Sequence, residues 1–168
     1  MEVIILGSDI LRQKAERVKN IDEEIKKIAK ELIETMHKER GIGLAGPQIG
    51  VMKRIFAVQT SRDNETPLIF INPSIIETSQ EMVKCEEGCL SIPGVWADVT
   101  RPETLTVQAW NEKGKAFTLK ADGILARAIF HEYDHLEGIL FIDRLPEAKR
   151  DKMLAKFEKI KERNKNKE

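Results

Sequence analysis

The sequence predicts an α+β fold in which strands occupy the middle of the chain and helices precede and follow them. Between residues 22 and 40, apolar residues recur every three or four positions, which is the period of an amphipathic helix. Short apolar or alternating runs fill residues 55–110, as expected for strands. Two further helical patterns follow, one around His131 and one after Pro146. No repeat or linker interrupts this order, so we expect a single domain over residues 1–168.

The composition is that of an ordinary globular protein and favours no charged partner. The 28 basic residues equal the 28 acidic residues in number, so the formal net charge is zero and no field attracts DNA or an anionic membrane. The apolar start of the chain lacks a basic region and ends at Gly7, and no apolar stretch approaches the roughly 18 residues of a membrane span. We therefore expect a cytoplasmic protein, whose two cysteines stay reduced as metal ligands or core residues.

An apolar segment and one amphipathic helix form the N-terminal part. Residues 3–6 predict a short strand or an apolar anchor. Asp22 can cap the helix, which we expect to stop at Arg40–Gly41. The apolar side of this helix is formed by Ile25, Ile28, Ala29, Leu32, Ile33 and Met36.

Residues 41–50 follow directly and contain four glycines and one proline, which excludes a regular helix. No lysine stands where a phosphate-binding loop would need one. Two interpretations remain open. The segment is either a tight structural turn or backbone packed close to a ligand, with Gln48 as the one side chain that can both donate and accept hydrogen bonds.

The predicted strands lie between residues 51 and 120. Apolar runs predict buried strands at 55–58 and at 68–71, and we expect Asn72–Pro73 to break the second one. Residues 60–67 are polar and predict a loop. Further strands are expected at 75–76, 82–85, 95–99, 104–110 and 116–120, the last two joined by a hairpin turn at 111–114.

Residues 147–168 predict a C-terminal helix followed by a charged tail. The apolar side of the helix carries Met153, Leu154, Phe157 and Ile160. We expect residues 161–168 to be frayed and solvated, with an excess of basic residues that could contact nucleic acid.

Residues 130–138 carry the pattern with the most specific chemistry. His131 and His135 are four residues apart, so on a helix both imidazoles lie on one face and can reach one cation. Glu132 follows the first histidine, and His-Glu-x-x-His on a helix is typical of metal-dependent hydrolases, where the glutamate moves a proton of the attacking water. The alternative is a helix that carries two histidines without a metal. The spacing and the glutamate favour the metal site.

A metal site needs a third ligand, and residue chemistry alone leaves the choice open. The acidic candidates downstream are Glu137, Asp143 and Glu147, but a cysteine thiolate is the stronger ligand for zinc or ferrous iron. If both Cys85 and Cys89 bind, the site is a closed structural zinc. If one binds, a position stays open for catalysis. Glu132 favours the open site, as does a separation between the cysteines and histidines far above the about 12–15 residues of a zinc finger.

Three segments together resemble the peptide deformylase family. Residues 41–48 (GIGLAGPQ) are similar to its first motif, residues 87–91 (EGCLS) to its second and residues 131–135 (HEYDH) to its third. The order and separation of the segments also agree, and the likeness extends to about Leu145. The resemblance implies sheets surrounding a central metal-binding helix.

The family resemblance also implies the site. Cys89 becomes the third ligand beside His131 and His135, and Cys85 a structural thiol. One divalent ion is expected, Fe²⁺ in nature with Zn²⁺, Ni²⁺ or Co²⁺ as substitutes. The implied reaction removes the formyl group of the initiator formyl-methionine and releases formate. The residues it assigns to catalysis are Glu132 for proton transfer, and the Gln48 side chain and Leu90 N–H for the oxyanion.

The resemblance further implies how the substrate binds. Gly43 would pair with the backbone of a nascent formyl-methionyl peptide, and Glu87 would pair with Arg101 to hold the cysteine loop. Asp134 would lie next to the metal ligands and hold them in place without binding the ion itself. The residues expected around the methionine side chain are Ile42, Leu44, Leu125 and Ala128. We expect no membrane or DNA partner, but ribosome contact through the basic tail.

Three positions depart from the family pattern. Phe130 replaces a glutamine, Gly46 replaces an alanine and Trp96 stands where a basic or polar residue is usual. None of them removes a group assigned to catalysis. Two other functions compete with the deformylase interpretation: a general metalloprotease, which would cut internal peptide bonds, and a structural zinc module.

Overall fold

The computed structural model describes residues 2–61 and 66–166 and confirms the α+β fold. The elements are, in chain order, η1 (Asp9–Arg12), α1 (Glu23–Lys38), β1 (Gly43–Ala45), η2 (Gly46–Ile49), β2 (Ile55–Val58), β3 (Leu68–Thr78), β4 (Met82–Cys89), β5 (Ile92–Pro102), β6 (Thr104–Trp110), β7 (Ala116–Asp122), α2 (Gly123–Leu136), η3 (Phe141–Arg144) and α3 (Glu147–Lys165).

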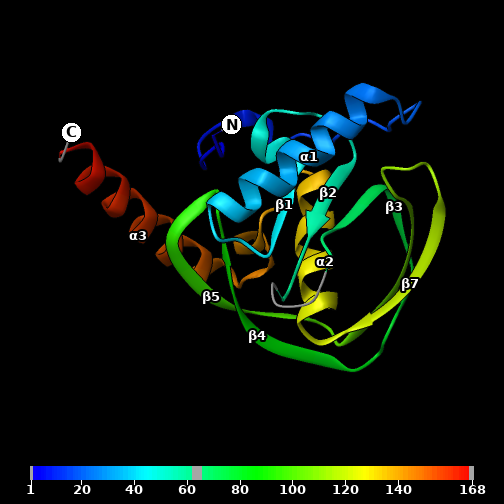
Figure 1. Cartoon of the computed structure of the whole chain (residues 1–168). Coiled ribbons are helices and arrows are strands. Elements are labelled where there is room, and N and C mark those ends of the chain that lie inside the picture. The colour runs from blue at the N-terminus through cyan, green and yellow to red at the C-terminus, as the bar shows by residue number, and fades with distance from the viewer. Residues whose placement is uncertain (1, 62–65, 167–168) are drawn as a thin grey trace.

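Two antiparallel sheets surround α2. The larger sheet has five strands in the order β1-β2-β3-β6-β7, and β4 with β5 forms a separate two-stranded ribbon. In Figure 1 the five-stranded sheet curves around α2, α1 covers the outside of β1 and β2, and the β4–β5 ribbon passes beneath α2. The helix that carries the histidines therefore lies at the centre of the molecule.

Strand β2 is covered on one face by helix α1 and on the other by helix α2. All four of its residues are buried. Ile55 and Ala57 belong to the core cluster that contains α1, whereas Phe56 and Val58 belong to the cluster that contains α2. Because successive strand residues point to opposite faces, a strand covered on both faces becomes continuously apolar, as the sequence is here.

Helix α1 begins and ends close to the predicted residues. The Asp22 side chain accepts a hydrogen bond from the Ile25 backbone N–H at 3.1 Å and so caps the helix. The predicted strand or anchor at residues 3–6 is an anchor in the structure. The Ile4 N–H donates to the Gln48 carbonyl at 2.7 Å and the Leu6 N–H to the Ser91 carbonyl at 2.8 Å. The N-terminal segment therefore ties two parts of the predicted site together.

The prediction that Asn72–Pro73 breaks a strand was wrong. Strand β3 continues through both residues to Thr78, with a shift of its register against β6 between Ile71 and Ser74. Asn72 has a positive φ of 50°, and its side chain bonds the Val18 N–H and carbonyl, both at 2.8 Å. A bulge accommodates a proline because the extra residue leaves the hydrogen-bond ladder.

The C-terminal helix extends further than predicted. Residues 161–165 belong to α3 instead of a frayed tail, although their side chains are exposed. Buried Phe157 anchors α3 against the β4–β5 ribbon side of the core, and the end of the helix projects away from the body (Figure 1). The predicted loop at residues 60–67 lies partly outside the described residues, as does the end of the predicted tail. Over the described ranges, no helix has the length and apolar character needed to span a bilayer.

Candidate metal centre and active site

Three ligand atoms converge where α2 passes the end of β4. His131 and His135 come from successive turns of α2 and are both buried, with their ring centroids 5.2 Å apart. The Cys89 Sγ lies 3.3 Å from the His135 Nε2. One ligand atom from each of the three residues lies within 4.8 Å of the others. A thiolate and two imidazoles at this separation fit a divalent ion that prefers soft ligands.

The β4–β5 turn delivers the cysteine of this cluster. Cys89 ends β4 and pairs with Ile92 across a two-residue turn. Cys85 is exposed further along β4, opposite Val99, and does not belong to the cluster. The described residues therefore bring together one cysteine and two histidines, which agrees with the open site and not with the closed one.

A buried chain of charges holds His131. The Glu87 Oε1 accepts a hydrogen bond from His131 Nδ1 at 2.8 Å, which leaves Nε2 as the nitrogen available to a metal. Arg101 donates two hydrogen bonds to Glu87, at 2.6 and 3.0 Å, and a third to Asp134 at 2.9 Å. Arg144 donates two more to Asp134, at 2.7 and 3.1 Å.

The predicted Glu87–Arg101 contact is thus the middle of a longer chain that runs from His131 to Arg144. Burial alone would raise the pKa of Glu87, but the hydrogen bonds from His131 and Arg101 outweigh it and lower this pKa to about 2. Arg127 also donates to Glu87, at 2.7 Å, and to the Val99 carbonyl at 2.9 Å. Glu87 is therefore a fixed anion that orients the imidazole.

Glu132 is buried beside the ligand cluster. Its Oε1 atom has no hydrogen-bond partner among the described residues. Burial is the main cause that raises the pKa of Glu132 to about 7. A carboxylate whose pKa lies near neutrality can both take up and release a proton under ordinary conditions.

Gly43 provides the room for the Glu132 carboxylate. A Cβ atom at Gly43 would lie 2.5 Å from the Glu132 Oε2, closer than any real contact. We expect Gly43→Ala to displace the carboxylate and to lower kcat/KM for hydrolysis by about ten- to a hundred-fold. Steady-state kinetics checks this, with thermal unfolding as the control for the fold. In a Glu132→Gln background, Gly43→Ala should lower kcat/KM only slightly further. If the losses of kcat/KM from the two replacements simply multiply, Gly43 does not act through Glu132.

Gln48, in the short helix η2, lies beside Cys89. Its Oε1 accepts a hydrogen bond from the Ala45 N–H at 2.9 Å. Its Nε2 donates to the Ser91 hydroxyl at 3.1 Å and lies 3.5 Å from the Cys89 sulfur. This amide is therefore held with its donor toward the cluster, which explains the tight η2 turn as part of the site.

The remaining predicted residues lie in different surroundings. Leu90 is partly buried and packs against the α1 cluster. Ile42 is 47 % exposed and Leu125 is partly buried, so both can contact a ligand. The side chains of Leu44 and Ala128, in contrast, are enclosed in two different core clusters.

Residue patterns did not reveal three of the polar groups at the site, namely Ser91, Arg127 and Arg144. Ser91 is fully buried against Gln48, and its place within residues 87–91 was the only available signal. Arg127 and Arg144 contact the site through Glu87 and Asp134, which are distant in the chain or on another element. Nothing in an isolated sequence marks such pairs.

A thiolate and two imidazoles beside a buried glutamate define the centre of a metal-dependent hydrolase. The family profile for polypeptide deformylases matches residues 1–151. The chain belongs to the peptide deformylase family, whose members are metalloenzymes that remove the formyl group from N-formyl peptides.

Named relatives and solved structures agree with this assignment. The peptide deformylase of Agrobacterium fabrum is 45 % identical over 94 % of both chains, and that of a Picosynechococcus strain is 48 % identical over 86 % of this chain and 79 % of its own. The Legionella pneumophila enzyme structure superimposes with a TM-score of 0.92 at 36 % identity, covering 97 % of this chain and 96 % of that one. A Synechococcus elongatus deformylase in complex with actinonin gives a TM-score of 0.89 at 42 % identity, covering 93 % and 86 %.

Proposed function

We propose that Cys89, His131 and His135 hold the metal ion of this deformylase and that Glu132 moves the proton during hydrolysis. The observation that carries this proposal is the convergence of the three ligand atoms within 4.8 Å beside a buried carboxylate. A bound divalent ion would act as a Lewis acid and would lower the pKa of water at the site. One thiolate and two neutral imidazoles leave such an ion with net positive charge.

The proton transfers fall to Glu132. Water adds to the formyl carbon, and the Glu132 carboxylate accepts the proton that the water loses. The bond between the formyl carbon and the amide nitrogen then breaks, and the protonated Glu132 donates to the leaving amine, so that formate and a free N-terminus result. A pKa of about 7 suits both steps, since the group must hold the proton only briefly.

Two donors are proposed for the charge that develops on the formyl oxygen, the Gln48 Nε2 and the Leu90 backbone N–H. The Gln48 amide is supported in this role by its hydrogen bond from the Ala45 N–H, which fixes the orientation of the group before the substrate arrives. Leu90 follows Cys89 directly, so its N–H lies next to the proposed metal ligand.

Strand β1 is proposed to bind the peptide. β1 lies at the edge of the five-stranded sheet and pairs with β2 on one side only. An extended formyl-methionyl peptide can add to such an edge through the backbone of Gly43. We place the methionine side chain near Ile42 and Leu125, and we leave out Leu44 and Ala128, which are buried in two different core clusters.

Further proposals concern the ion and the surroundings of the enzyme. The family resemblance is the ground for proposing Fe²⁺ as the natural ion, and the donor set of one cysteine and two histidines also accepts Zn²⁺, Ni²⁺ or Co²⁺ as substitutes. We propose that residues 1–168 form one catalytic domain that acts in the cytoplasm on nascent peptides. The projecting end of α3, which carries Lys159, Lys161, Arg163 and Lys165, is proposed to approach the ribosome (Figure 1).

The two cysteines provide a matched test of the metal site. We expect Cys89→Ser to lower metal affinity by more than about a hundred-fold, because even replacements around the ligands cost about 10- to 100-fold. Cys85→Ser should keep both the metal and the release of formate from formyl-Met-Ala-Ser. Metal analysis after anaerobic dialysis and a formate assay check both variants. Equal metal loss in the two variants would instead indicate a closed structural site.

A further inference from the structure

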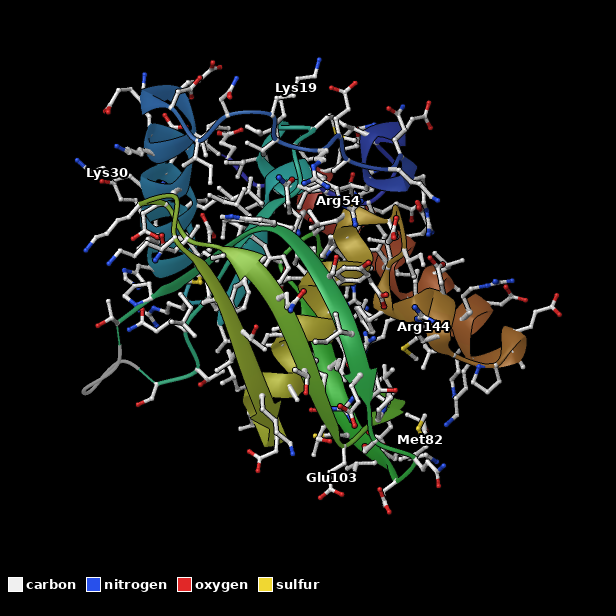
Figure 2. All side chains as sticks on the ribbon, turned by 90° about the vertical axis from the view of Figure 1, so that its right-hand side faces the viewer. Lys19, Lys30, Arg54, Met82, Glu103 and Arg144 are labelled. Carbon is white, nitrogen blue, oxygen red and sulfur yellow. The ribbon has the colours of Figure 1, made fainter. Side chains whose placement is uncertain are left out.

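A cavity of about 580 Å³ lies on a different side of α2 from the metal ligands. The α2 residues that line it are Phe130, Tyr133, Asp134 and Glu137, which form one stripe at helical spacing and include neither histidine. Lys14, Met82 and Arg144 line it from other elements. Figure 2 shows Met82 and Arg144 on the side of the molecule that faces the viewer. The volume lies within the range of small-molecule sites.

The charges in this cavity favour a single negative charge on a ligand. Asp134 is already paired with Arg101 and Arg144, and Glu137 lies 3.5 Å from an Arg54 nitrogen. The Lys14 ammonium forms no ion pair with any described residue, and the Arg144 side chain is 46 % exposed. Arg101 also lines the cavity, so three positive side chains stand against two carboxylates, and a monoanion balances the remaining positive charge whereas a dianion such as a phosphate ester exceeds it.

Apolar side chains supply most of the remaining lining, together with Thr78 and Thr100. Phe130 and Tyr133 come from α2, Ile75 from β3 and Met82 from β4, and Met82 is 55 % exposed. Phe130 is one of the positions where the sequence departs from the family pattern, and here it contributes an aromatic ring to the lining. A large exposed methionine beside aromatic rings is an adaptable surface for an apolar ligand.

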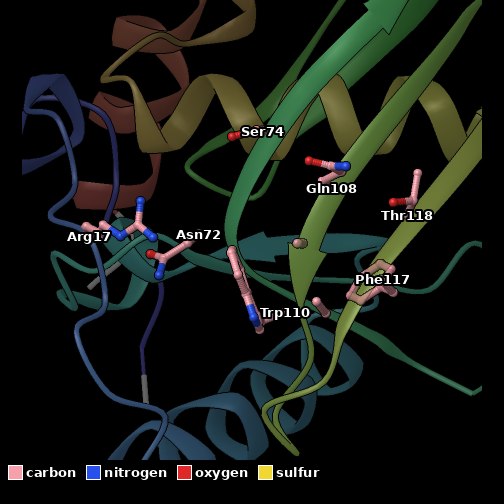
Figure 3. A pocket seen from close by; sticks show the side chains of 9 residues that line it. Arg17, Asn72, Ser74, Gln108, Trp110, Phe117 and Thr118 are labelled. Atoms are coloured by element: carbon pink, nitrogen blue, oxygen red, sulfur yellow. The ribbon is translucent and has the colours of Figure 1, made fainter.

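We propose that this cavity binds a small monocarboxylate with an apolar body. The carboxylate is received by Lys14 and Arg144, and the body packs against Met82 and Phe130. This inference does not depend on the deformylase reaction, because the cavity contains no proposed metal ligand. A smaller cavity of about 370 Å³ on the outer face of the sheet offers no comparable set: Figure 3 shows Arg17 near Asn72 at one end, far from Thr118, and Arg17 is its one charged residue.

Methionine-methyl NMR gives a site-specific test, because the chain has five methionines and Met82 alone lines this cavity. The probe is 4-phenylbutyrate, added to the zinc-loaded and to the metal-free full-length protein. We expect the Met82 methyl signal to shift in a saturable way in both forms, while the signal of fully buried Met36 stays in place. Lys14→Met should weaken binding about three- to five-fold, as for an exposed ion pair.

The matched control is Lys19→Met, an exposed lysine outside the cavity (Figure 2), which should leave the dissociation constant unchanged. The neutral amide 4-phenylbutyramide should bind more weakly than the acid, by at least the factor by which Lys14→Met weakens binding of the acid. No saturable shift at Met82, equal binding of acid and amide, or equal effects of the two lysine variants would each overturn the proposal. A shift that requires zinc would place the carboxylate at the metal centre and would overturn it as well.

Discussion

Glu132→Gln is expected to lower kcat/KM for a formyl-methionyl peptide by about 10²–10⁴-fold while the metal content stays unchanged. Glutamine keeps the size of the side chain but cannot take up the proton that the attacking water must lose. The carboxylate is buried, and its Oε1 has no hydrogen-bond partner among the described residues. Formate release and metal analysis on the same samples measure both quantities.

Glu137→Gln serves as the matched control for this variant. Glu137 caps the same helix but is partly exposed and paired with Arg54, so its loss should change kcat/KM by less than about two-fold. If Glu132→Gln keeps most of its activity, proton transfer belongs to another group. If it loses the metal, Glu132 acts through the ligands, and the assigned role is wrong.

Glu132→Gln has a second expected result, in the metal-free protein. Burial raises the pKa of Glu132 from 4.5 to about 7, so the folded state binds a proton that the unfolded state releases over this range. The contribution of Glu132 to the free energy of unfolding should therefore fall as the pH rises from about 4.5 to about 7. Thermal unfolding measures this effect. Between pH 5 and pH 8, the unfolding temperature should fall less for Glu132→Gln than for the unchanged chain.

Local spacing was sufficient to predict the part of the site that lies on one helix. His131, Glu132 and His135 are placed by helical geometry alone, and the structure brings both histidines to one cluster as expected. The third residue of the cluster, Cys89, comes from a hairpin far away in the chain. Residue chemistry left the choice between Cys85 and Cys89 open, and the family resemblance favoured Cys89.

Long-range packing explains what the sequence could not predict. Strand β3 passes through Asn72–Pro73 because the Asn72 side chain bonds the backbone of Val18, and no local rule foresees that contact. Arg144 in η3 donates a hydrogen bond to Asp134 in α2, and Arg127 in α2 donates to Glu87 and Val99 of the β4–β5 ribbon. Amphipathic patterns predict which residues face the core, whereas polar contacts between elements depend on the finished fold.

Arg101→Met is expected to lower the free energy of unfolding by about 3–5 kcal/mol, the largest stability effect of a single replacement that we predict. Arg101 is 4 % exposed and bonds both Glu87 and Asp134. Methionine fills a similar volume but leaves two buried carboxylates without their shared cation. Urea unfolding of the metal-free protein measures the loss.

Arg12→Met is the matched control, because Arg12 pairs with Asp143 at the surface, where an ion pair contributes about 0–1 kcal/mol. A loss of less than 1 kcal/mol for Arg101→Met as well would show that Arg127 and Arg144 compensate the two carboxylates. Adding Glu87→Gln to Arg101→Met should recover part of the loss, since one unpaired charge is then removed. The added Glu87→Gln replacement should nevertheless lower metal affinity, because Glu87 orients His131. These variants would thereby separate what the chain of charges contributes to folding from what it contributes to the metal site.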